Sequence, residues 1–512
     1  MHNAFTRHAW LIAWGAISIL AGCNRPKTDT ARETGAVSNE DSAKATASAT
    51  AAKGKVPVTT KSEEAKKLYD RGLTYSDQVR FHDARQVFQQ AAAKDPEFAM
   101  AHYQLALTSP SNKEALAHLN QAVALAGKAS EGERLAILSL QAGFNADPAK
   151  SLEYSKEAVQ KYPEDERARQ ALAFAYQGQQ EYQKAIDELN KAIELNPNFS
   201  TAYNSLGYAY RPLNKNAEAE QAFKKYIELV PNDPNPYDSY AELLMKTGRF
   251  DESIAQYRKA LSIDPHFTNS YYAIAGDLMY QGKYPQALAE AQKLSSAARN
   301  DGDRRLVFFT RTLVYADQGK TDLALNEMEK QYAFDSKLGD PAQMAQDLDG
   351  IGIILVETGR PDQAQKKFQQ SLDIQTKSDL SPETKEDANL AHHYHLGRVA
   401  LAKNDLATAK SEAAEYLKGA EAKANDFRIR QGHELAGMIA IKEKNFDQAT
   451  SELEKANQQD PYVVYQIAVA YAGKGDQAKA QESYKKAAEM YILPTINYAL
   501  IRVKAAKQAG GA

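Results

Sequence analysis

The chain has 512 residues, of which 43% are hydrophobic and 25% charged, and these shares are those of a globular protein and exclude disorder over the whole length. Its 63 Lys and Arg residues balance 66 Asp and Glu to a net charge of −3, which argues against nucleic-acid binding because phosphates select a basic surface. The single Cys excludes internal disulfides and any cysteine-rich zinc or iron–sulfur centre.

The first 22 residues predict a secretory signal peptide. Residues 10–21 form an apolar stretch that is shorter than the roughly 20 residues of a membrane-spanning helix. It runs into Leu20-Ala21-Gly22-Cys23, which resembles the lipobox of bacterial lipoproteins. The resemblance implies cleavage before Cys23 and acylation of its thiol. Because Asn24 rather than Asp follows, it also implies an outer-membrane lipoprotein that faces the periplasm; the alternative is an ordinary cleaved signal.

A segment poor in large apolar residues follows the signal. Between Asn24 and Lys67 there is no Leu, Ile, Met or aromatic residue. Such a segment cannot bury enough apolar surface to offset the entropy of ordering it. We therefore expect residues 23–61 to comprise the lipidated Cys and a disordered tether.

The central sequence repeats with a period of 34 residues. Pro163, Pro197, Pro231 and Pro265 follow one another at this spacing. Several coupled columns at one period predict a repeat architecture. The same period carries columns of small and of bulky residues: Ala185, Ala219, Ser253 and Ala287; Leu189, Phe223 and Tyr257; and Tyr176, Tyr210, Leu244 and Leu278.

Within each repeat, apolar residues three and four positions apart predict two packed helices. Gly207 leaves room for the paired helices to approach closely, and Phe223 is expected to fill the space beside that contact. Pro231 ends the second helix because it has no amide hydrogen and disfavours helix at the residue before it. Gly248 and Gly282 are predicted to make the turn between the two helices.

This pattern resembles the tetratricopeptide repeat, a 34-residue helix–turn–helix unit. The resemblance implies an all-α fold, a right-handed α-solenoid of about twelve such units. We expect a regular array over residues 62–299 and an array of longer units over residues 300–490. Residues 491–512 are expected to form a capping helix and tail, with one apolar stripe and lysines opposite, because a terminal repeat needs a wet outer face.

Motifs that carry chemistry are missing from the sequence. There is no nucleophile elbow, P-loop or zinc-protease motif, and no long segment remains outside the repeats for a catalytic domain. His392 and His395 could share one helix face, but no third ligand accompanies them, so we interpret this cluster as structural. The sequence thus predicts a protein that is not an enzyme and has no cofactor or metal.

Ligands of tetratricopeptide-repeat proteins usually lie in the concave groove, against the exposed face of the first helix of each unit. Aromatic residues interleaved with amides and charges on this face would suit a peptide, although an ordinary solvated face is the alternative. The resemblance places nine residues of this chain there: Gln170, Phe174, Asn204, Tyr208, Arg211, Asp238, Glu242, Tyr272 and Met279.

These features predict a membrane-anchored scaffold that binds proteins or peptides in the bacterial envelope. The alternative is a non-enzymatic module that captures glycan or unfolded polypeptide for a separate enzyme or exporter. The sequence leaves the partner, the pathway and the oligomeric state open.

Overall fold

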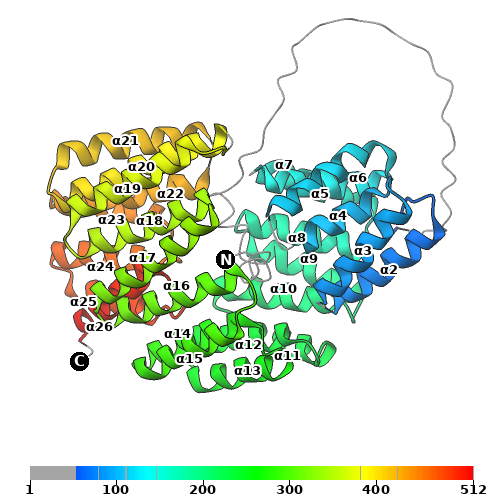
Figure 1. Ribbon diagram of the computed structural model, residues 1–512, viewed down its shortest axis with the longest axis horizontal. Coiled ribbons are helices and arrows are strands. Elements are labelled where there is room, and N and C mark those ends of the chain that lie inside the picture. Colours follow the sequence, from blue (N-terminus) through cyan, green and yellow to red (C-terminus); the bar gives the residue numbers. More distant parts are fainter. Residues whose placement is uncertain are drawn as a thin grey trace, which may run out of the picture. The chain divides into compact units, whose positions relative to one another are not determined.

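The computed structural model describes residues 54–510 except residues 79, 110, 111, 146, 381 and 424. These described residues form twenty-five α-helices and no strand (Figure 1), which confirms the predicted all-α class. Consecutive helices pack as antiparallel hairpins from α2 with α3 to α24 with α25, twelve in number, and the single helix α26 follows. This arrangement confirms the prediction of an all-α solenoid built from about twelve helix–turn–helix units.

The chain divides into two compact units between Val230 and Pro231. The described part of the N-terminal unit, residues 54–230, holds five hairpins. Its helices are α2 (Glu63–Asp77), α3 (Phe81–Lys94), α4 (Ala99–Thr108), α5 (Asn112–Leu125), α6 (Glu131–Phe144), α7 (Pro148–Lys161), α8 (Glu166–Gly178), α9 (Tyr182–Leu195), α10 (Ser200–Tyr210) and α11 (Asn216–Leu229), with short 3-10 helices η2 (Ala126–Lys128) and η3 (Arg211–Leu213).

The C-terminal unit, residues 231–510, holds seven hairpins and the terminal helix. The longer units expected from residue 300 onward correspond to α16–α22, which have 17 to 21 residues each, whereas α23–α25 have 10 to 14. Its helices are α12 (Pro234–Lys246), α13 (Phe250–Ile263), α14 (Thr268–Tyr280), α15 (Tyr284–Ala297), α16 (Asp301–Asp317), α17 (Thr321–Leu338), α18 (Pro341–Glu357), α19 (Pro361–Lys377), α20 (Pro382–Ala402), α21 (Leu406–Ala422), α22 (Asp426–Lys442), α23 (Phe446–Lys455), α24 (Pro461–Lys474), α25 (Gln477–Glu489) and α26 (Ile496–Gln508).

The first helix of each hairpin contacts the first helix of the next in several successive pairs, among them α12 with α14, α14 with α16, α18 with α20, α20 with α22 and α22 with α24. We call this row of first helices the inner layer. It is the layer on which the sequence places the partner-binding residues.

Close helix contact within a hairpin depends on glycine, as predicted. A Cβ atom added to Gly207 of α10 would lie 2.6 Å from the ring of Phe223 in α11, which is fully buried. Gly72 with Phe88 and Gly352 with Phe368 repeat the arrangement, with 2.4 Å from the added Cβ to the ring in both. The glycine is therefore required by the bulk of the aromatic residue sixteen positions later.

The turns inside the hairpins use left-handed backbone. Gly248 and Gly282 have φ of 75° and 71°, in agreement with the prediction for both. At the corresponding turn between α22 and α23, Lys444 adopts φ of 60° although it carries a side chain. A residue with a Cβ is strained in this conformation.

Lys444→Gly is therefore expected to stabilise the α22–α23 hairpin by about 0.5–1 kcal/mol, the relief of left-handed strain less the greater freedom of glycine in the unfolded chain. Gly282→Ala is the matched reverse change. Nothing lies within 4 Å of an added Cβ there, so the substitution introduces only the strain of left-handed backbone. Urea unfolding followed by circular dichroism should show a gain for the first variant and a loss for the second. A loss for both would contradict the turn assignment.

Candidate partner-binding surfaces

The nine residues predicted to bind a partner lie on or directly after inner-layer helices. Gln170 and Phe174 are in α8, Asn204 and Tyr208 in α10, and Arg211 opens η3. In the C-terminal unit the predicted residues are Asp238 and Glu242 of α12, and Tyr272 and Met279 of α14. Cys23 and residues 1–22 lie outside the described residues.

In the N-terminal unit the predicted residues contact one another and their neighbours. The Gln170 amide donates to the Thr201 hydroxyl over 3.2 Å, joining α8 to α10. The ring of Tyr208 stands edge-on to that of Phe223, with 5.3 Å between centroids, and only 7% of Tyr208 is exposed. Tyr208 therefore offers less stacking surface to a ligand than its place in the sequence suggests.

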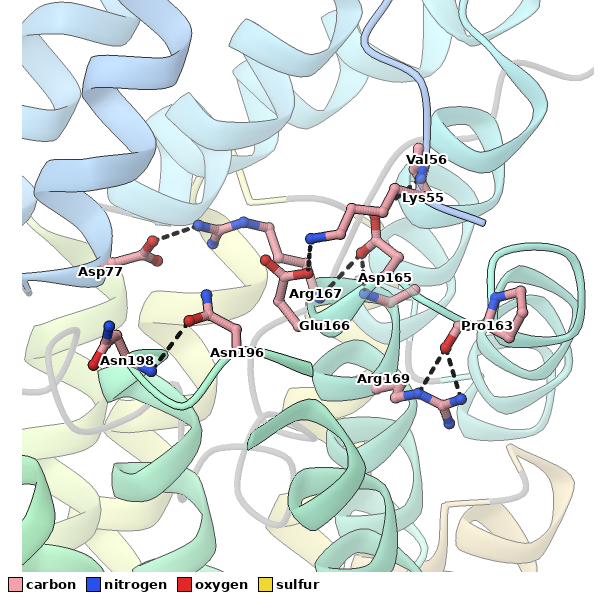
Figure 2. A network of polar contacts seen from close by, with 11 residues as sticks. Lys55, Val56, Asp77, Pro163, Asp165, Glu166, Arg167, Arg169, Asn196 and Asn198 are labelled. Carbon is pink, nitrogen blue, oxygen red and sulfur yellow. Dashed lines mark hydrogen bonds and ion pairs between the residues drawn. The ribbon is translucent and has the colours of Figure 1, made fainter. Parts of the chain in front are cut away.

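The C-terminal end of α2, in the first hairpin, contacts residues of the fourth and fifth hairpins. The Arg167 guanidinium of α8 binds the Asp77 carboxylate of α2 over 2.6 Å, as Figure 2 shows. The Ser200 hydroxyl at the start of α10 donates to the Asp77 carbonyl. The Arg167 guanidinium also lies 5.1 Å from the ring centroid of Phe199. These contacts join the inner-layer helices α2, α8 and α10 directly.

An extended segment, residues 54–61, lies along the beginnings of α4, α6 and α8; we call it the strap. The sequence predicts disorder up to residue 61, but these eight residues make regular main-chain contacts. The Val56 amide donates to the Asp165 carboxylate over 3.0 Å, and the Thr59 amide donates to Glu133 over 2.8 Å (Figure 2 shows the first). The Lys61 amide donates to Asp95 over 3.0 Å.

Ion pairs and apolar contacts complete the strap. The Lys55 ammonium binds Glu166 over 2.8 Å (Figure 2), and the methyl groups of Val56 come within 2.8 Å of a Cβ placed on Gly132. The Asp165 carboxylate caps α8 through Oδ1, which accepts two amide hydrogen bonds from the first turn, and its Oδ2 accepts the hydrogen bond from Val56. No apolar periodicity marks the strap, so only its docking surface on the folded repeats explains its order.

Gly132→Ala is expected to release the strap, because the added methyl would overlap Val56 and also the Tyr162 ring at 2.7 Å. Overpacking of about 1–3 kcal/mol should lower the hydrogen-exchange protection of the Val56 and Thr59 amides roughly tenfold or more. Gly127→Ala is the control, since nothing lies within 4 Å of its added Cβ. Unchanged protection in the Gly132 variant would show that the strap does not depend on this contact.

In the C-terminal unit, the chain's own end covers the predicted residues of α14. The Tyr272 hydroxyl donates to the Pro494 carbonyl over 2.6 Å, and the Tyr280 hydroxyl donates to the Ile492 carbonyl. Met279 has no exposed surface and belongs to the same apolar cluster as Tyr498 of α26. A partner could reach Met279 only in the absence of α26.

Helix α26 is held by a buried ion pair. The Arg502 guanidinium of α26 binds both carboxylate oxygens of Asp317 in α16, over 2.7 and 2.5 Å, and the Tyr284 hydroxyl donates to the same carboxylate over 3.0 Å. Burial raises the pKa of Asp317, and the Arg502 charge opposes that shift. The sequence predicts a helix with one apolar stripe, and Lys504 and Lys507 are exposed as expected.

The buried surface of α26 is wider than one stripe. Tyr498, Ala499, Leu500, Ile501 and Ala505 are all at most 6% exposed. Helix α26 packs on α16, α18 and α24 as well as on the preceding α25, and it contacts α14 through Arg502 and Tyr498. A cap at the end of a solenoid needs only the contact with α25. The contacts with the inner layer are a feature that periodicity alone could not indicate.

Further along the inner layer, side chains of successive helices bind one another. Arg398 of α20 is 2% exposed and binds Glu357 of α18 over 2.9 Å. The Tyr462 hydroxyl of α24 donates to the same Glu357 over 2.7 Å, and the Tyr394 hydroxyl donates to Glu434 over 2.9 Å. Burial raises the pKa of Glu434 to about 7. These contacts join four helices, and only the buried Nε of Arg398 among the groups named here has no hydrogen-bond partner, which favours a structural role.

A second buried polar cluster joins α16, α17 and α18. Arg305 binds Asp335 over 2.5 Å, and the Gln331 amide donates to Asp347 over 2.6 Å. Asp335 and Asp347 are 0% and 1% exposed. Burial, and then the neighbouring Asp335 carboxyl, raise the pKa of Asp347 to about 8. Because its members are buried and bind one another, we interpret the cluster as part of the repeat packing.

The histidines His393 and His395 of α20 contact different neighbours and not a common ligand. His393 contacts Glu412 over 2.7 Å. In the next hairpin, His433 of α22 contacts Glu452 in the same way, over 2.7 Å. His395 lies against the Phe368 ring at 4.2 Å between centroids, and burial lowers its pKa to about 3. Across the described residues, no group of three metal-ligating side chains comes together, and none of the described helices is long and apolar enough to cross a membrane.

Family models described as tetratricopeptide repeat match residues 69–130 and 168–234, residues 234–267 and residues 461–491. No curated protein sequence matches the chain. None of the matched models describes a catalytic family.

Solved structures of similar proteins include three from bacteria. A tetratricopeptide repeat protein from Parabacteroides merdae is 18% identical, with a TM-score of 0.34 over 53% of this chain and 94% of that one. MamA from Desulfovibrio magneticus is 17% identical, with a TM-score of 0.29 over 33% and 93%. A thermophilic repeat protein from Thermus thermophilus is 23% identical, with a TM-score of 0.27 over 42% and 98%. From the matched models and the helical hairpins at those positions, the chain contains tetratricopeptide repeats over residues 69–130, 168–267 and 461–491.

Proposed function

We propose that this protein is a membrane-anchored tetratricopeptide-repeat scaffold that binds protein partners in the bacterial envelope. Tetratricopeptide-repeat proteins generally mediate protein–protein interactions. The observation that carries the proposal is the succession of twelve hairpins, which occupies the described chain from residue 63 to residue 489 and leaves no described segment for a catalytic domain. Large modular surfaces of this kind suit partner binding.

The proposed anchor is the lipobox cysteine at the end of the signal peptide. Each buried CH₂ of an acyl chain contributes about 0.8 kcal/mol, and stable attachment takes two or more chains. Residues 24–53 would then connect the membrane to the strap. The residue after the cysteine is Asn24, which favours the outer membrane and a periplasmic orientation.

Cys23→Ala is expected to move the protein from the membrane fraction to the soluble periplasmic fraction, because the acylated thiol is its proposed attachment. Membrane fractionation and intact-mass spectrometry of the full-length protein measure this directly. The control is Ser38→Ala in the same segment, which should leave the partitioning unchanged. Membrane association of the Cys23 variant equal to that of the unchanged protein would reject lipidation.

Partner binding is tested by site-specific photocrosslinking in the cell. A photoreactive residue at Gln170 or Phe174 reports on the inner layer of the N-terminal unit, and one at Lys184, whose side chain is 59% exposed on α9, reports on the outer helices. A small reproducible set of envelope proteins joined to the first two positions and not to the third supports the scaffold. Glycan in place of protein would instead support the capture module.

A further inference from the structure

We propose that the inner layer around α14, α16 and α18 is a helix-binding surface and that α26 occupies it as a built-in substitute for a partner. The partner it fits is a short helix that carries an arginine and follows an extended lead-in. This inference rests on the proposed scaffold function and specifies one binding surface for it. We call the residues that receive the chain's end the α26 seat: Tyr272, Gly276, Met279, Tyr280, Asp317 and Gly350.

The lead-in before α26 is recognised through its main chain. Both tyrosine hydroxyls of the seat donate to carbonyl oxygens, those of Ile492 and Pro494, and not to side chains. Every peptide carries such carbonyls, so these two hydrogen bonds place no demand on sequence. The arrangement is the one by which binding proteins hold extended peptides in general.

The seat leaves room for a close backbone approach. A Cβ added to Gly276 would lie 2.9 Å from Pro494. One added to Gly350 would lie 2.8 Å from Met328 of α17 and 3.2 Å from Ile496. Neither glycine has a positive φ, so backbone conformation does not require them. Gly276 is explained by the segment that lies against it, and Gly350 by that segment together with Met328.

The buried carboxylate of Asp317 determines which helices the α26 seat can bind. Asp317 is fully buried, and within the seat its bidentate partner is Arg502. A buried carboxylate strongly disfavours an occupant that lacks the matching cation. The seat therefore selects for an arginine one to two turns into the helix and accepts varied residues around it.

The attachment of α26 allows release. It is the one described helix that follows the twelve hairpins without a second helix of its own, and the non-helical stretch 490–495 joins it to α25. The hairpins of a solenoid pack mainly on their neighbours, so they keep these contacts when α26 leaves and lose only the contacts that α26 makes with α14, α16 and α18. A tethered helix has an effective concentration in the millimolar range, so a free partner must exceed that competition.

The test uses the full chain and a fluorescent peptide with the sequence of residues 490–510. The unchanged protein should bind it weakly, because α26 competes. Arg502→Asp places a like charge against Asp317 and should release α26, so that the peptide, which still carries the arginine, binds at least tenfold more tightly. Asp317→Arg combined with Arg502→Asp restores the pair in reversed order and should bind no peptide.

Hydrogen exchange of the unchanged protein gives an independent readout. The amides of residues 498–505 are expected to exchange at least tenfold faster than those of α14 and α16, through an opening that leaves the repeats folded. Exchange of all three helices together would make α26 a fixed part of the core and overturn the proposal. If Arg502→Asp fails to fold, Tyr280→Phe should selectively speed exchange in residues 490–508, and no selective change would likewise overturn it.

A negative result in the peptide experiment can be distinguished from a negative result in the photocrosslinking experiment. A fixed α26 together with crosslinked envelope proteins leaves the scaffold in place and removes only this surface. Peptide exchange at the α26 seat without any protein crosslinked from Gln170 or Phe174 argues against the proposed function while the seat itself stands.

Discussion

Gly207→Ala is expected to destabilise the α10–α11 hairpin by about 1–3 kcal/mol, because the new methyl would stand 2.6 Å from the ring of Phe223, which is fully buried and would have to shift. Phe223→Ala should cost about 3–5 kcal/mol through the cavity it leaves. Hydrogen exchange of α10 and α11 in the full chain measures both losses where they occur, since damage in a repeat array stays local.

The double variant separates close packing from simple loss of stability. With Phe223 reduced to Ala, the methyl at position 207 has room, so Gly207→Ala should add little further cost and the two losses should not sum. Gly127→Ala supplies the control, as no atom lies within 4 Å of its added Cβ. Additive losses in the double variant would mean that Gly207 is needed for a reason other than the Phe223 ring.

The hairpins could be predicted because their determinants recur. A glycine or alanine in the first helix, a bulky residue sixteen positions later and a glycine in the turn are local requirements, and a period of 34 repeats them in the same order. The structure has these residues in the expected places, from Gly72 with Phe88 to Gly352 with Phe368. The paired helices therefore follow from sequence spacing, and the resemblance to the tetratricopeptide repeat implies the solenoid that they build.

The strap and the α26 seat could not be predicted in the same way. The strap has no apolar periodicity, and its order comes from carboxylates at helix ends that lie up to 111 residues away, as in the pairing of Lys55 with Glu166. The Arg502–Asp317 pair spans 185 residues. Such contacts depend on how successive repeats stack, which a single repeat does not specify.

The predicted partner-binding residues illustrate the same limit. Their assignment to first helices needs only the helical register, and Tyr272 and Met279 do lie on α14. The exposed face predicted for them is wrong for Met279, which has no exposed surface. Whether that surface is open depends on the path of the chain after α25. Because the last eighteen residues have the composition of an ordinary amphipathic helix, nothing in them indicates that they return to α14 and α16.

Lowering the pH from 8 to 5 is expected to stabilise the hairpins around Asp347. Its pKa in the folded protein is raised to about 8 by burial and by the Asp335 carboxyl, against an ordinary value near 4. Between these values the folded state holds a proton that the unfolded state has lost, so stability falls as the pH rises through this range. At about 1.4 kcal/mol for each unit of pKa, the loss between pH 5 and pH 8 should be about 2–4 kcal/mol.

Asp347→Asn should remove this dependence, because an amide keeps the shape and the hydrogen bond from Gln331 while carrying no charge at any pH. The variant should therefore exceed the unchanged protein by about 1–2 kcal/mol at pH 5, where the carboxyl of the unfolded chain is already ionised, and by about 2–4 kcal/mol more at pH 8, as measured by urea unfolding at the two pH values. Asp349 and Glu434, whose pKa values burial raises to about 7, contribute the same sign in both proteins and cancel in the comparison. Asp322→Asn, at a side chain that is 87% exposed, controls for the loss of a carboxylate as such. If the difference between the Asp347 variant and the unchanged protein does not grow with pH, Asp347 is ionised in the folded state and Arg305 compensates both carboxylates of the cluster.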